Sequence, residues 1–316
     1  MARILPTIFD LLAMTSPHPR RWSLRLAACA VVAGCSVCSV GSRLPRTAHG
    51  PVVLEVRGAV KGGPYQLADA DLAALGQRTV RCVDPAAGSA QAARFTGVDL
   101  AALLGDHLEL TGDADTVVFH TADLMEVPVP LSVIRQLRPT LADRADDARL
   151  EGNGARLVAW PNVAQPGVTS DPRAAGWWAH RVTALEVVSA VRTVGRALAL
   201  PEAAPAGARA GAALYGERCL ACHRLRAVGG RRGPELTRVT GRVTAADLRR
   251  KLQDHPGWHL PGQAQPTAEA AAQLDTFLRT VAAYDGVAGA FPDADADAEG
   301  RTQSEAPEPP PGPPGP

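Results

Sequence analysis

This chain of 316 residues has few aromatic residues and few long apolar runs, and its positive and negative charges nearly balance. Aromatic residues make up 4%, which argues against a surface that stacks nucleic-acid bases. A formal net charge of +1 creates no general attraction for polyanions, so we expect no nucleic-acid partner. Hydrophobic residues make up 46%, and the length predicts two folded units with additional tails.

The cysteines are too unevenly spaced for a framework of disulfides, and each group needs its own explanation. They are Cys29, Cys35, Cys38, Cys82, Cys219 and Cys222. Single histidines such as His120 and His180 have no partner at ligand spacing, so we expect them to have packing roles.

The first 34 residues have the layout of a secretory signal. Arg20 and Arg21 precede an apolar run from Leu24 to Gly34, which is shorter than the ~20 residues of a membrane-spanning helix. The segment that ends at Cys35 resembles the lipobox of bacterial lipoproteins, which implies a lipid on Cys35 and attachment to a membrane surface. The alternative is cleavage further along, with Cys35 discarded. Either way we expect export to the periplasmic side.

Composition divides the rest of the chain into four predicted parts. A first domain spans 50–194, an Ala/Pro/Gly-rich linker 195–206, a helical domain 207–286, and an acidic, proline-rich and disordered tail 287–316.

Cys219-Leu220-Ala221-Cys222-His223 has the C-x-x-C-H spacing of covalent haem attachment. Two residues between the cysteines let both sulfurs reach one edge of the haem, and the next histidine becomes an axial ligand of the iron. A redox dithiol would need a βαβ setting. A zinc site would need two further ligands, and the two predicted domains, 50–194 and 207–286, contain no second cysteine pair.

The surroundings of this motif resemble a class I cytochrome c domain. Gly233-Pro234-Glu235-Leu236 matches the segment in which the proline carbonyl accepts the proton of the axial histidine ring. The resemblance implies an all-α domain with one haem c, bound by Cys219, Cys222 and His223. It also implies that its first and last helices cross near Gly211 and Phe277.

The methionine that this family places opposite the histidine is absent. The three methionines are Met1, Met14 and Met125, and Leu260-Pro261 stands where a Met-Pro pair is expected. His259 is the first candidate for the distal iron ligand, because it directly precedes Leu260. His255 is the second, and an iron left open or bound to water is the alternative.

The sequence of the first domain predicts an α+β fold, in which a mixed β-sheet is combined with short helices. We expect strands at 52–57, 78–83 and 116–121. We expect short helices at 69–75 and 99–104. Its short segments, from Leu54-Glu55-Val56-Arg57-Gly58 through Trp160-Pro161 to Trp178–Glu186, resemble a short, degenerate molybdopterin-binding domain of the sulfite oxidase family. The resemblance implies Cys82 as a thiolate ligand of molybdenum, and a buried hydrophobic role is the alternative.

Three functions follow from these motifs. The leading one is a c-type cytochrome that passes electrons to or from a redox partner protein in the periplasm or membrane. The second is a molybdenum-dependent oxidoreductase, similar to sulfite dehydrogenases, with the haem as fused electron acceptor. The third is a haem-based sensor of a small gas, which the missing methionine suggests.

Overall fold

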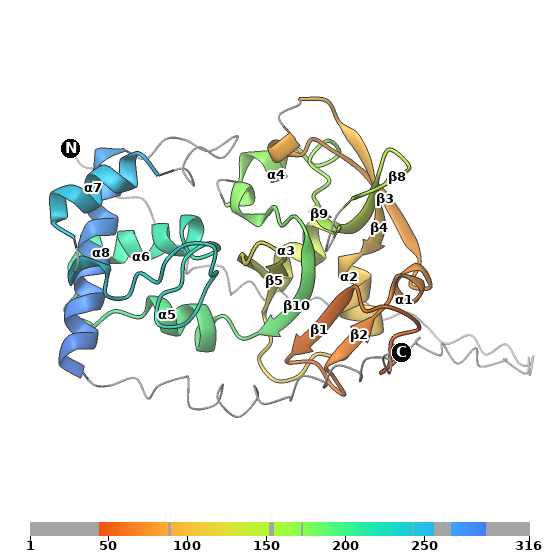
Figure 1. Cartoon of the computed structure of the whole chain (residues 1–316), viewed down its shortest axis with the longest axis horizontal. Helices are drawn as coiled ribbons and strands as arrows, with labels where there is room; N and C mark the ends of the chain where they lie inside the picture. The colour runs from red at the N-terminus through yellow and green to blue at the C-terminus, as the bar shows by residue number, and fades with distance from the viewer. Residues whose placement is uncertain are drawn as a thin grey trace, which may run out of the picture. The chain divides into compact units, whose positions relative to one another are not determined.

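The computed structural model describes residues 44–87, 90–151, 155–171, 173–241, 243–255 and 267–288. These residues form two five-stranded sheets with short helices, followed by three longer helices (Figure 1). All of them belong to one compact unit, Val40–Pro316. No helix among them is long and apolar enough to cross a membrane. The predicted signal, Cys35 and most of the predicted tail lie outside the described residues.

The first sheet has the strand order β2-β1-β10-β5-β6. Its strands are β1 (Leu54–Gly58), β2 (Tyr65–Leu67), β5 (Thr116–Thr121), β6 (Glu126–Pro130) and β10 (Val182–Val188). β1 and β10 run parallel, and the other pairs are antiparallel. In β1, Leu54 and Val56 are fully buried and alternate with the half-buried Glu55 and Arg57, as the period of two in a strand requires.

The second sheet has the order β3-β4-β7-β8, with β9 paired to β7. Its strands are β3 (Gln77–Cys82), β4 (Ala93–Asp99), β7 (Thr140–Ala145), β8 (Ala148–Arg149) and β9 (Leu157–Ala159). Gly97 lets β4 approach β7 closely, because a Cβ there would lie 2.0 Å from the Leu141 carbonyl oxygen.

Short helices and turns connect these strands. The α-helices are α1 (Asp69–Ala73), α2 (Leu100–Ala102), α3 (Leu131–Leu137) and α4 (Gly167–Ser170). Helical turns of other types span Pro85–Ala87, Leu103–His107, Ala174–Trp177, Val191–Gly195 and Val239–Gly241. Asp99 begins α2 by accepting hydrogen bonds from the backbone N–H groups of Ala101 and Ala102. The result is a mixed α/β fold with two sheets, of the class that the sequence predicted.

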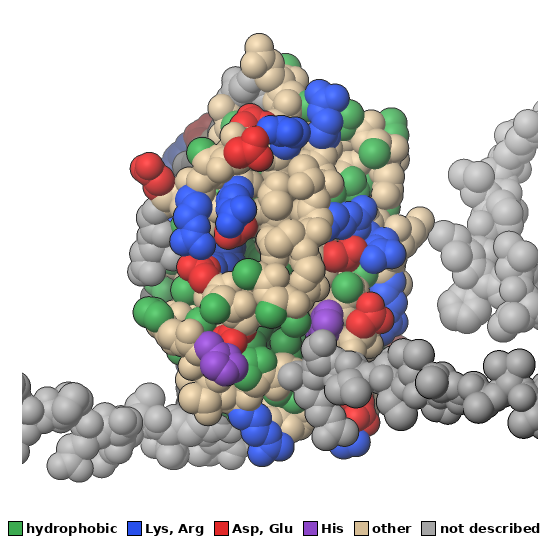
Figure 2. All heavy atoms as spheres, turned by 90° about the vertical axis from the view of Figure 1, so that its right-hand side faces the viewer, with side chains coloured by type: hydrophobic (Ala, Val, Ile, Leu, Met, Phe, Trp, Pro, Cys, Tyr) green, Lys and Arg blue, Asp and Glu red, His purple; other side chains and the backbone are tan. Residues whose placement is uncertain are grey.

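Charges of both signs are interspersed over the surface of this part of the chain. Figure 2 shows one face on which Lys and Arg side chains alternate with Asp and Glu side chains, with no large patch of either sign. This distribution agrees with the net charge of +1.

The helical part consists of α6 (Ala206–Arg218), α7 (Ala245–Gln253) and α8 (Ala268–Ala288). α6 packs across α8 at Gly211, where a Cβ would lie 2.2 Å from the Gln273 carbonyl oxygen and 2.7 Å from the Phe277 Cβ. The rings of Tyr215 and Phe277 pack against each other beside this crossing, with centroids 5.5 Å apart. The expected contact between Gly211 and Phe277 is therefore present.

The segment predicted as a linker packs against these helices instead of acting as a free spacer. It begins with α5 (Arg196–Leu198), and Ala197 is fully buried. Arg226 donates to the carbonyl oxygens of Ala197 and Ala199, at 3.1 and 2.7 Å, and pairs with Asp285 at 2.8 Å. Sequence composition did not predict this packing, because Arg226, which holds the segment through these hydrogen bonds, lies about thirty residues further along the chain.

Gly211→Ala should lower the free energy of unfolding by about 2 kcal/mol, because the new methyl group must displace the α8 backbone. Gly207→Ala in the same helix is the matched control, since its Cβ would meet only the Thr276 side chain, at 3.8 Å or more. Urea denaturation measures both variants. Equal stability of the two would contradict the close helix crossing.

Candidate functional site

The C-x-x-C-H motif forms one tight turn at the end of α6. Cys219 caps the helix, and its backbone N–H donates to the Tyr215 carbonyl oxygen at 2.9 Å. The Cys219 carbonyl oxygen then accepts from the N–H groups of Cys222 and His223, at 3.0 and 2.8 Å. Both cysteines are half-buried, and neither is in a disulfide. The turn therefore brings two thiols and one imidazole together.

A carbonyl group fixes the orientation of the His223 ring. His223 Nδ1 lies 2.9 Å from the Pro234 carbonyl oxygen and donates its proton there, which leaves the Nε2 lone pair for a metal. Gly233 provides the room for the ring, because a Cβ at this position would lie 2.2 to 2.7 Å from three ring atoms. Contacts with the His223 ring therefore explain both residues of the Gly233-Pro234 motif.

Tyr215 stabilises the same turn through hydrogen bonds. It is fully buried, and its hydroxyl lies 3.3 Å from the carbonyl oxygens of both His223 and Arg224. Burial raises the pKa of this hydroxyl above its ordinary value, so it remains a hydrogen-bond donor.

The cysteine pair does not have the electrostatics of a redox dithiol. Burial, with a smaller contribution from Cys222, raises the pKa of Cys219 to about 12, and burial also raises the pKa of Cys222. Reactive dithiols have lowered pKa values, commonly because they begin a helix, whereas Cys219 stands at the end of one. Within the described ranges there is also no group of three or more metal-binding side chains of the kind zinc requires.

A second imidazole lies opposite His223. The ring centroids of His223 and His255 are 5.5 Å apart, and the rings are inclined by 57°. His255 follows the end of α7, which Leu248 and Leu252 anchor to the helical core. Burial lowers the pKa of His255, and the charge of His223 lowers it further, so the ring is neutral near pH 7 and has a lone pair. His259, Leu260 and Pro261 lie outside the described residues.

The turn between β5 and β6 contacts the motif directly. Glu126 N–H donates to the Ala221 carbonyl oxygen at 2.9 Å, and Arg231 N–H donates to the Leu124 carbonyl oxygen at 2.8 Å. Arg232 adds an ion pair with Asp123 at 3.0 Å and lies 3.4 Å from the sulfur of Met125. Met125 therefore contacts an arginine of the loop that follows the motif.

Cys82 lies elsewhere and does not fit a molybdenum ligand. It ends β3 with no exposed surface and packs with Phe95, Ala142, Leu157 and Ala159. Burial, and to a lesser extent the charge of Asp84, raises its pKa to about 12. It lines neither of the two cavities described for the molecule. The alternative, a buried hydrophobic role, agrees with this environment.

Two of the single histidines differ in their surroundings. His180 Nε2 lies 2.9 Å from Asp84, away from the cavities, which fits the structural role expected from the sequence. His120 instead lines a cavity together with Glu126, and its Nε2 lies 2.8 Å from Glu186. Sequence spacing did not reveal this group, because its members come from β5, β6 and β10.

Comparison with known proteins adds a distant likeness to solved structures. No protein-family model and no curated protein matches the chain. Among solved structures, the sulfane dehydrogenase SoxCD from Paracoccus pantotrophus matches 43% of this chain with 16% identity and a TM-score of 0.32. This chain spans 38% of the SoxCD chain that it matches. At that TM-score the likeness adds nothing to what the strands themselves establish.

Cys82 should react with iodoacetamide far more slowly than an ordinary thiol while the protein is folded. A thiol pKa of about 12 leaves almost no thiolate at pH 8, and the side chain has no exposed surface. Peptide mass spectrometry after labelling, with and without urea, measures the modification. Rapid labelling of Cys82 in the native protein would contradict the buried environment.

Proposed function

We propose that this chain is an exported c-type cytochrome that transfers electrons through one haem attached covalently at Cys219 and Cys222. The observation that carries the proposal is the arrangement of His223. Its ring is held by Pro234 beside two unpaired thiols, with a second imidazole 5.5 Å away. When bound, haem supplies an iron that alternates between Fe(III) and Fe(II).

The roles of the surrounding residues follow from their contacts. Cys219 and Cys222 are protonated thiols in a tight turn, and each would become a thioether to one side of the haem. His223 offers Nε2 to the iron, while the Pro234 carbonyl oxygen keeps Nδ1 occupied and prevents the ring from rotating. Gly233 is required because any side chain there would overlap the ring.

We propose His255 as the distal ligand of the iron. A metal bound by two imidazoles lies about 2 Å from each nitrogen, so facing rings a few ångströms apart can share one ion. The ring centroids of His223 and His255 are 5.5 Å apart, which brings both imidazoles within reach of one iron. His255 also remains neutral, which a ligating imidazole requires. His259, the first candidate from the sequence, is the competing ligand.

This arrangement favours an electron carrier over the two other hypotheses. A gas sensor needs an open iron position, which His255 would fill if it binds the iron. A molybdenum-dependent oxidoreductase needs an accessible thiolate, whereas Cys82 is buried and protonated. We propose a redox partner protein on the periplasmic side, with the chain held at the membrane surface by a lipid on Cys35. Two imidazole ligands would place the potential below that of a histidine/methionine pair.

Replacing both Cys219 and Cys222 by alanine should remove all covalent haem. Denaturing electrophoresis followed by peroxidase staining measures the attached haem. Cys82→Ala is the matched control and should keep full staining, because this cysteine packs within a different cluster. Haem that persists in the double variant would contradict the proposed attachment.

His255→Ala should convert the oxidised iron from low spin to high spin and make carbon monoxide binding to the reduced protein fast. The reason is that the variant opens the sixth coordination position. Electron-paramagnetic resonance and stopped-flow spectroscopy measure the two effects, and His180→Ala should change neither. If His259→Ala opens the iron and His255→Ala does not, His259 is the ligand and our assignment of His255 is wrong.

A further inference from the structure

A cavity of about 740 Å³ lies beside the turn that contacts the C-x-x-C-H motif. Its walls come from β1, β5, β10, the β5–β6 turn and the segment around Arg156, and Arg231 of the loop after the motif also lines it. This volume lies within the range of small-molecule sites in proteins. None of the residues proposed to hold the haem, Cys219, Cys222, His223 and His255, lines the cavity, so it needs a separate explanation.

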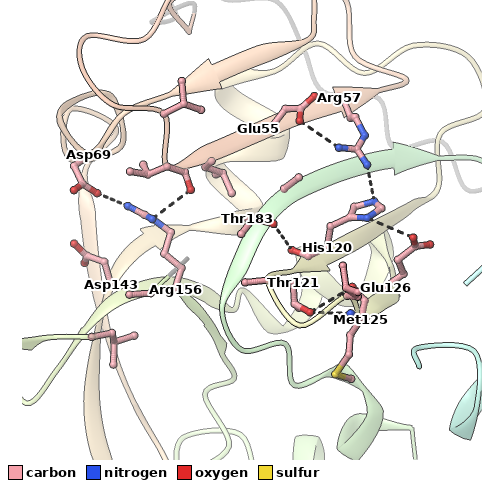
Figure 3. Close-up of a pocket in the computed structure, with 18 of the residues that line it drawn as sticks. Glu55, Arg57, Asp69, His120, Thr121, Met125, Glu126, Asp143, Arg156 and Thr183 are labelled. Atoms are coloured by element: carbon pink, nitrogen blue, oxygen red, sulfur yellow. Dashed lines mark hydrogen bonds and ion pairs between the residues drawn. The ribbon is translucent and has the colours of Figure 1, made fainter. Parts of the chain in front are cut away.

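The charges that line the cavity are balanced and mostly paired. On one side Arg156 pairs with Asp69, and Arg149 lies 3.3 Å from the same carboxylate. On the other side Arg57 lies 3.1 Å from Glu186 and 3.3 Å from Glu55. Figure 3 shows Arg156 with Asp69 on one side of the cavity and Arg57 with Glu55 on the other, with Thr183 between them. A ligand with a net charge would have to compete with these internal ion pairs.

His120 and Glu126 form a donor and acceptor pair in this cavity. His120 Nε2 lies 2.8 Å from a carboxyl oxygen of Glu186 and 3.2 Å from the Arg57 guanidinium, so Nδ1 is the ring nitrogen on the Glu126 side. Nδ1 lies 3.8 Å from the Glu126 carboxyl oxygen, too far for a direct hydrogen bond. Burial raises the pKa of Glu126 and Glu186 raises it further, against the opposing effect of His120. A ligand hydroxyl can therefore bridge the imidazole and the carboxyl group, because it forms one hydrogen bond as donor and another as acceptor.

A hydroxyl group matches this pair, because it donates one hydrogen bond and accepts another. Apart from the His120 imidazole, the described lining contains no aromatic ring on which a ligand could stack. On the Arg156 side, the carboxylate of Asp143 also lines the cavity and adds a hydrogen-bond acceptor to it. The cavity therefore suits a ligand that binds through several hydroxyl groups and no charge.

We propose that this cavity binds a small uncharged polyhydroxylated molecule of the sugar or polyol class. One hydroxyl of the ligand lies between His120 Nδ1 and the Glu126 carboxyl group and forms a hydrogen bond with each. Other hydroxyls meet the polar groups near Arg156 and Asp143. The proposal does not depend on the haem, because all of these contacts come from the protein.

Isothermal titration calorimetry of the full-length, haem-loaded protein tests this with four probes. D-glucose should bind with one site per chain. Gluconate and glucosamine, its anionic and cationic counterparts, should bind at least about tenfold more weakly because they disturb paired charges. Resorcinol presents hydroxyl groups on an aromatic ring. Binding of resorcinol or of either charged probe in preference to glucose would overturn the proposal, as would no glucose binding.

Four variants distinguish the loss of the hydroxyl contact from a general loss of structure. His120→Leu and Glu126→Ala should each weaken glucose binding by about tenfold, the effect of one hydrogen bond. Glu126→Gln should keep most of the affinity, because the amide can still form the hydrogen bond to the ligand hydroxyl. His180→Leu, a histidine outside the cavity, should bind as the wild type does. Equal affinity of Glu126→Ala and Glu126→Gln, or an equal loss in His180→Leu, would contradict the assigned contacts.

Discussion

The hydrogen bond from His223 Nδ1 to the Pro234 carbonyl oxygen is the constraint on which the rest of the site depends. It fixes which ring nitrogen is available to a metal and which way the ring faces. Gly233 is required for this contact, since a Cβ would occupy the place of the ring. The buried Tyr215 then holds the carbonyl groups of the same turn. Without this hydrogen bond, the ring could rotate and lose its position opposite His255.

The sheet part of the chain also contributes to this site. The β5–β6 turn exchanges backbone hydrogen bonds with Ala221 and Arg231, on either side of His223. Ala221 packs against the main hydrophobic cluster of the sheets as well. The loop around His223 is thus supported from two directions, by Tyr215 within the helices and by the β5–β6 turn. This also places Glu126 between the motif and the cavity, since its backbone contacts Ala221 and its side chain lines the cavity.

Features that depend on local spacing could be predicted from the sequence. The strand Thr116–Thr121 was expected at its observed bounds, and Thr244 caps α7 by accepting from the Asp247 N–H. The relation of Pro234 to His223 also follows from a short motif. Features that depend on distant pairing could not be predicted. Pairing of β5 with β6 and β10 gathers His120 with its carboxylates, and Arg226 packs the predicted linker. The deep burial of Cys82 likewise results from contacts with three other strands.

Mass spectrometry of the tryptic peptide Cys219–Arg224 from the purified native protein tests the central claim most directly. The peptide contains both cysteines and His223, and trypsin cleaves after Arg218 and Arg224. Our account predicts that its mass is increased by one haem, bound through two thioethers that survive reduction and denaturation. The protein must be made in a host that exports it and has the haem attachment machinery. A peptide of unmodified mass, or one that contains only a reducible disulfide, would then contradict our account.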